Sequence, residues 1–111
     1  MPKPSSGRKN TGKVSKIIAE THALGYKSVS EKTVAVAVRN LTYFTEKALD
    51  GAKKRELKKI IRQEVSSDGL AIMAVMLKHS EKVNIPEKIT SDFIAETLIN
   101  YAKKVNDKNV A

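Results

Sequence analysis

The middle of the chain carries an apolar stripe that constrains the fold more than any other feature. Apolar or small side chains recur at i, i+3, i+4 and i+7 from Val34 onward, and no proline follows before Pro86. This spacing predicts one long helix over about residues 31–58. This predicted helix is much longer than the usual length of about 11 to 12 residues. Its apolar side is correspondingly long and needs partners along its whole length to be covered. The stripe consists of Val34, Ala37, Val38, Leu41, Phe44, Thr45, Ala48, Leu49 and Ala52.

Shorter helices are predicted on both sides of the long one. Apolar residues from Val14 to Leu24 have helical spacing, and Gly25 follows as a C-terminal stop. Small polar residues precede the later apolar segments, as helix caps do. We therefore expect an all-α fold with helices in the order short, long, short and medium. The predicted caps are Ser30, Ser66 or Ser67, and Thr90 or Ser91.

Length and charge limit the class of protein and of partner. A chain of 111 residues with 41% hydrophobic residues is long enough for one domain, and a domain of this size is more stable when it associates. Its 21 Lys and Arg against 12 Asp and Glu give a net charge of +9, which attracts polyanions, nucleic acid before a membrane or an acidic protein. Without cysteine, disulfides and thiolate chemistry are excluded. No apolar run is long enough for a membrane span or a signal peptide.

Cations are concentrated in two segments. Residues 1–12 combine Pro, Gly, Ser and basic residues, which predicts a flexible basic tail able to lie along phosphates; the alternative is a terminus that only aids solubility. Residues 53–62 contain six Lys or Arg against Glu56 alone. This second cluster could bind the phosphate backbone of a duplex. Alternatively, its cations only interact favourably with the C-terminal end of a helix dipole. Because few aromatic residues lie among the cations, we expect the protein to bind duplexes in preference to stacking on single strands. We expect Tyr43 and Phe44 in the core or in a dimer contact.

Catalysis finds little support in the sequence. His22 and His79 are the only imidazoles, and neither has carboxylates at the spacing that metal binding or nucleophilic chemistry requires. No glycine-rich loop is present to cradle a phosphate. We expect no enzyme, no metal and no cofactor.

Three segments together resemble the histone fold, in which a short, a long and a short helix are joined by two extended loops. Residues 12–18 (GKVSKII) resemble the start of the first histone helix, and residues 28–32 (SVSEK) resemble the first loop. Residues 65–75 (VSSDGLAIMAV) resemble the second loop and third helix. The resemblance implies a tail at residues 1–12, a histone-fold core at 13–79 and a C-terminal helical extension at 80–111.

The resemblance further implies a dimer with crossed long helices, in which Val65 pairs as a short strand with Val29 of the partner. The chain departs from the family at Gln63 and Glu64, where DNA-binding histones usually carry Lys or Arg and Thr, and Arg62 either pairs with Asp68 or is free for DNA. The implied dimer interface is Val34, Val38, Leu41, Phe44, Thr45, Ala48 and Leu49. The expected DNA-binding residues are Lys3, Arg8, Lys9, Lys13, Lys16, Lys27, Ser28, Ser30, Lys32, Lys58, Lys59, Arg62 and Ser66.

These observations lead to three hypotheses. The first is a histone-like protein that dimerises with itself or another histone-fold chain, binds double-stranded DNA with little sequence specificity, and wraps or compacts it inside a nucleoid or nucleus. The second is a histone-fold interaction subunit of a transcription, replication or chromatin complex with weak DNA contact, which Gln63 and Glu64 favour. The third is an unrelated helical bundle that binds RNA or an acidic protein.

Overall fold

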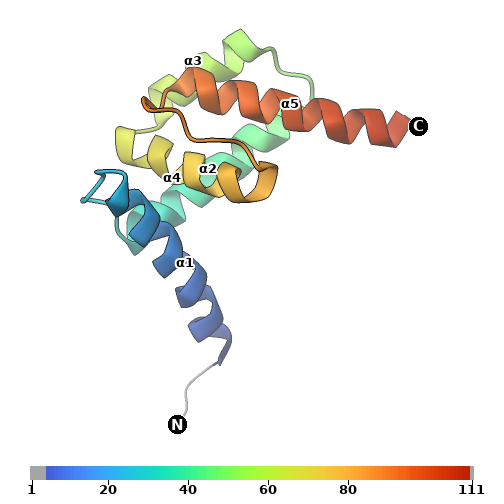
Figure 1. The fold of residues 1–111 in the computed structure, drawn as a ribbon. Coiled ribbons are helices and arrows are strands. Elements are labelled where there is room, and N and C mark those ends of the chain that lie inside the picture. The colour runs from blue at the N-terminus through green and yellow to red at the C-terminus, as the bar shows by residue number, and fades with distance from the viewer. Residues whose placement is uncertain (1–4, 111) are drawn as a thin grey trace.

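The structure, a computed structural model, has five α-helices within residues 5–110 (Figure 1). It describes the backbone of residues 5–110 and the side chains of residues 12–108, and within this part of the chain it contains no strand. The predicted all-α class is therefore confirmed. The helices are α1 Ser5–Ala23, α2 Glu31–Leu49, α3 Lys54–Glu64, α4 Ser67–Glu81 and α5 Ser91–Val110.

The predicted long helix over residues 31–58 is wrong, because the chain turns between α2 and α3. Gly51 has a φ of +98°, and the N–H groups of Gly51 and Ala52 donate to the carbonyls of Ala48 and Lys47. These two bonds form a Schellman motif, which ends a helix at a glycine in the left-handed region. The rod expected from the apolar stripe is thus two helices that fold back on each other.

Helix α1 ends in the same way, and its end was predicted. Gly25 has a φ of +104°, and the N–H groups of Gly25 and Tyr26 donate to His22 and Thr21. At its other end α1 begins at Ser5, within the segment expected to be a flexible tail; side chains up to Thr11 lie outside the described residues. Flexibility of the tail stays a prediction.

The predicted caps are confirmed for the three later helices that were expected. Ser30 Oγ accepts the N–H of Thr33 at 3.4 Å, and Ser66 Oγ accepts the N–H of Gly69 at 3.2 Å. Thr90 Oγ1 accepts the N–H of Phe93 at the start of α5. Each hydroxyl satisfies one N–H that has no partner inside its helix.

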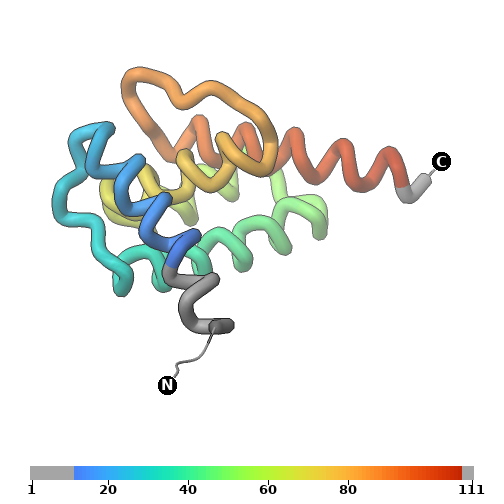
Figure 2. Tube along the Cα trace, turned by 60° about the horizontal axis from the view of Figure 1, so that its bottom comes forward, coloured from blue at the N-terminus to red at the C-terminus, as the bar shows by residue number. Residues whose placement is uncertain are grey.

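The larger core cluster joins α2, α3, α4 and α5. Phe44, Leu57, Ile61 and Ile94 are each at most 1% exposed. Across the surface of this core, Lys54 and Lys58 of α3 form ion pairs with Asp92 of α5. The segment expected to be a C-terminal extension therefore supplies a wall of the main core. Figure 2 shows α5 running beside the rest of the helices and then beyond them toward the C-terminus.

A smaller cluster seats α1 on α2 and α4. Val29, Val34, Ala37 and Ile72 are buried there, with partly buried α1 side chains against them. Thr21 is fully buried, and its Oγ1 donates within α1 to the carbonyls of Ile17 and Ile18, which satisfies the hydroxyl. Val29, expected to form a strand with a partner chain, is therefore packed within its own chain.

The chain itself covers most of the residues expected at a dimer interface. Val34, Leu41, Phe44 and Ala48 are buried, whereas Val38 is 38% exposed. The remaining two, Thr45 and Leu49, are partly buried. The premise that the apolar stripe needs a second chain is therefore wrong for this structure: α1, α3, α4 and α5 cover most of it. Dimerisation itself stays a prediction, and it would have to use another surface.

Candidate nucleic-acid interface

Helix α3 has a buried face and a cationic face on opposite sides. Leu57 and Ile61 are fully buried against the core. At 100° per residue, Arg55, Lys59 and Arg62 fall on the side opposite this pair, and all three are exposed. The three residues form the outer face of α3. The local sequence produces this arrangement because Leu57 and Ile61 are four residues apart, whereas the three cations lie two residues before, two residues after and five residues after Leu57.

The outer face carries charge that no acidic side chain of residues 12–108 neutralises. Among the described residues, Arg55, Lys59 and Arg62 have no acid within 4.0 Å, whereas Lys54 and Lys58 each lie 3.5 Å from Asp92. The ion pairs hold the flank of α3 to α5 and leave the outer cations for a ligand. An open hollow of about 300 Å³ on this surface is lined by Arg55, Lys58, Lys59 and Arg62.

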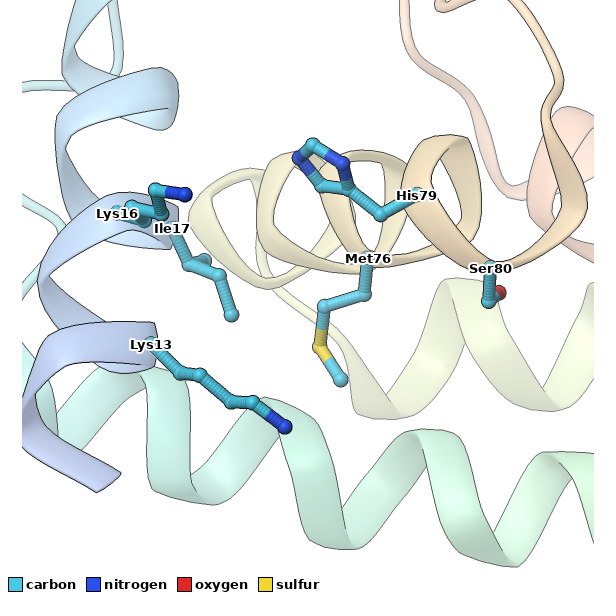
Figure 3. Close-up of a pocket in the computed structure, with 6 residues that line it drawn as sticks. All are labelled: Lys13, Lys16, Ile17, Met76, His79 and Ser80. Carbon is cyan, nitrogen blue, oxygen red and sulfur yellow. The ribbon is translucent and has the colours of Figure 1, made fainter. Parts of the chain in front are cut away.

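Two predicted DNA-binding lysines lie away from α3. Lys13 and Lys16 are exposed on α1 and line an open groove of about 400 Å³ between α1 and α4. Figure 3 shows Lys13 and Ile17 reaching from α1 toward Met76 of α4, with His79 above them. The floor of the groove is apolar and its rim is cationic.

The expected loop residues are exposed around the start of α2. Lys27 and Ser28 lie in the connection between α1 and α2, and Lys32 lies in the first turn of α2. Ser30 and Ser66 are occupied as helix caps. Both views place the first residues of α2 and of α4 on the same side of the folded molecule (Figures 1 and 2). Lys3, Arg8 and Lys9 lie outside the described residues.

A charged cluster beside the groove links α1 to α4. Glu20 Oε1 lies 2.6 Å from His79 Nε2, and Glu20 Oε2 lies 3.4 Å from Lys78 Nζ. The hydrogen bond with His79 is the main cause of a lowered pKa of Glu20; partial burial opposes it, and the charges of His79 and Lys78 add to it. The other imidazole, His22, has its Nε2 at 2.9 Å from the carbonyl oxygen of Val29.

We expect Glu20→Gln to destabilise the fold more at pH 5 than at pH 3, by less than about 1 kcal/mol because the ion pairs are partly exposed. A carboxyl whose pKa is lowered on folding adds stability that is present above its ordinary value of 4.5 and is lost as the pH falls through the lowered value. Urea unfolding of both proteins at the two pH values measures the difference. If the difference in unfolding free energy between wild type and Glu20→Gln is equal at the two pH values, or larger at pH 3, the lowered pKa of Glu20 is contradicted.

The sequence analysis did not assign Arg55 or Tyr43 to a nucleic-acid interface. Arg55 belongs to the outer face of α3 but was counted only as part of the cluster at 53–62. Tyr43, expected in the core or a dimer contact, is 50% exposed on α2. Arg62 forms no ion pair with Asp68 or with any other acid of the described residues. Of the two alternatives for Arg62, the structure therefore shows the unpaired guanidinium.

No protein-family model, curated protein or solved structure matches this chain. None of the described helices has the length and apolar character needed to cross a membrane. No three His, Cys, Asp or Glu side chains of the described part gather closely enough to hold a metal ion.

Proposed function

We propose that the protein binds double-stranded DNA through its phosphate backbone, with little sequence specificity, and that the outer face of α3 is the main contact. The observation that carries the proposal is a set of three exposed cations, unpaired within the described part of the chain, opposite a buried apolar pair on one helix. Lys and Arg contacts to phosphates give affinity and position without reading bases. The proposed activity is binding without a chemical reaction.

The spacing of the cations suits successive phosphates. Arg55 and Arg62 are seven residues apart, which corresponds to about 10 Å along a helix at 1.5 Å per residue. Phosphates of one DNA strand follow one another every 3.4 Å or so along the duplex axis. The outer face of α3 therefore spans about three phosphate steps of one strand.

Compaction of DNA requires more than one duplex contact per particle, and the chain offers a second basic surface at Lys13 and Lys16. These lysines lie on α1, which projects from the helical body (Figure 1). A chain with two such surfaces can bridge duplex segments without the crossed helices of a histone dimer. The histone-like part of the hypothesis rests on the capped segments at Ser30 and Ser66, and the DNA-binding part rests on α3. Such a role places the protein with the chromosome, in a nucleoid or nucleus.

A second candidate function is an interaction subunit of a larger complex. The observation that favours it is a set of large apolar side chains exposed on α2: Val36 is 42%, Val38 38% and Tyr43 50% exposed. Isolated exposed apolar residues are common on soluble proteins, so this observation carries less weight than the cationic face.

Fluorescence anisotropy with a random-sequence duplex at several salt concentrations tests the proposal. We expect tight binding at low salt and a slope of log K against log salt of about −3 or steeper, because each neutralised phosphate adds about −0.9. Two duplexes of different sequence should bind within a few-fold of each other. Absence of binding at low salt, or affinity that does not change with salt, would contradict the proposal.

A further inference from the structure

A hollow beside the outer face of α3 has the chemistry of a nucleobase site. It lies between α2 and α3, has a volume of about 370 Å³, and is lined by Asn40, Tyr43, Phe44, Ile60, Gln63 and Glu64. Small-molecule sites typically occupy about 300–1,000 Å³ and combine apolar or aromatic walls with a few polar groups. The duplex contact proposed above does not use this hollow.

Tyr43 supplies a flat surface that is available to a ligand. Tyr43 is 50% exposed, and its ring packs against the buried Phe44 ring, with the two centroids 5.7 Å apart and the ring planes tilted by 56°. A ring held by a core residue loses little conformational freedom when a base stacks on it. Lys47 Nζ lies over the Tyr43 ring, 5.4 Å from its centre, in a cation–π contact. A base that stacks on this face displaces the ammonium group, which is then free to pair with the phosphate of the nucleotide.

The polar groups of the hollow match the edge of a base. Asn40 and Gln63 each carry a donor and an acceptor in one amide, and Glu64 carries acceptors only. Within residues 12–108, none of these three side chains forms a hydrogen bond or ion pair with the protein. Amides read adenine and carboxylates accept from the amino group of cytosine in known complexes. A base with an exocyclic amino group is therefore the best match.

Neighbouring charges place a nucleic-acid strand at the mouth of the hollow. Lys59 precedes Ile60, and Arg62 precedes Gln63, so the outer face of α3 and the hollow are adjacent sectors of one helix. A backbone held by the outer face passes beside the hollow.

We propose that the hollow between α2 and α3 binds an unpaired base of a nucleic-acid strand, with Tyr43 as the stacking surface and Asn40, Gln63 and Glu64 contacting the base edge. The inference rests on the proposed function, because the phosphates of the same strand are held by the outer face of α3. The protein then prefers strands with exposed bases over strands that offer phosphates alone.

The test compares a single strand of about 12 deoxycytidines, within the site size of one small domain, with an abasic strand of the same length and charge. We expect the wild type to bind the deoxycytidine strand about tenfold or more tightly than the abasic one. Tyr43→Ala should remove this preference while leaving duplex affinity unchanged, and Val36→Ala, another exposed apolar residue of α2, should keep it. A ribocytidine strand measured in parallel tells whether DNA or RNA supplies the base.

A second variant gives a reading that does not depend on affinity. The chain contains no tryptophan, so Tyr43→Trp introduces a single reporter, whose fluorescence we expect to be quenched by the deoxycytidine strand and not by the abasic strand. Equal wild-type affinity for both strands, or a preference that survives in Tyr43→Ala, would overturn the inference and leave duplex binding standing. Failure to bind the duplex at low salt would overturn the proposed function and this inference with it.

Discussion

Replacing Arg55, Lys59 and Arg62 together with alanine is expected to lower duplex affinity on the order of 10²-fold at about 0.1 M salt, because each lost phosphate contact removes about 0.9 from the slope of log K against log salt. The slope itself should become shallower by about 2 to 3. The three side chains are exposed and have no ion-pair partner among the described residues, so the fold should tolerate the change. Anisotropy titrations at several salt concentrations measure both quantities.

The matched control removes the same charge elsewhere. Lys88, Lys103 and Lys108 are also exposed, and their replacement by alanine lowers the net charge of +9 by the same three units. We expect this variant to lose less than about fivefold in affinity, because distant surface charges act only through a screened field. If the two triple variants weaken binding equally, net charge and not the outer face of α3 determines the affinity.

Phe44→Ala is expected to destabilise the fold by about 3–5 kcal/mol, which is a large part of the stability of a typical domain. Phe44 is 1% exposed in the core formed by α2 to α5, so its removal leaves a cavity. Val38→Ala, from the same group of residues once expected at a dimer interface, should cost less than about 1 kcal/mol because Val38 is 38% exposed. Urea unfolding followed by circular dichroism compares the two.

The same unfolding curves distinguish a core made by one chain from a core shared by two. If α2 is covered by its own chain, the midpoint stays constant as protein concentration changes. An obligate dimer shifts its midpoint with concentration through mass action. A clear shift, together with a large loss in Val38→Ala, would show that the exposed side of α2 is buried against a partner.

Local signals in the sequence predict the helix ends well, and the error in the fold came from overlooking one of them. Gly25 was identified as a helix stop, and it adopts a φ of +104° in a Schellman motif. Gly51 occupies the equivalent position at the end of α2, with a φ of +98°. The apolar spacing continues across Gly51 because α2 and α3 each bury one side in the same core. Periodicity alone could not separate two helices that share a core.

The sequence predicts where the cations of the candidate site are concentrated, but it does not predict which of them are paired with acids. The cluster at residues 53–62 is visible in the sequence, yet its division into paired and free cations depends on Asp92, which lies on α5 and meets α3 only in the fold. Tyr43 was expected in the core or in a dimer contact because it was counted with the apolar stripe, and it is 50% exposed.

Chemical-shift mapping of the isotope-labelled protein with a short duplex tests the central claim most directly, because it reports each backbone amide separately. If the outer face of α3 binds the phosphate backbone, the largest changes on titration will fall on α3 around Arg55, Lys59 and Arg62, and they will shrink as salt is added. Changes confined to α1 or to the exposed side of α2, with α3 unaffected, would contradict the account.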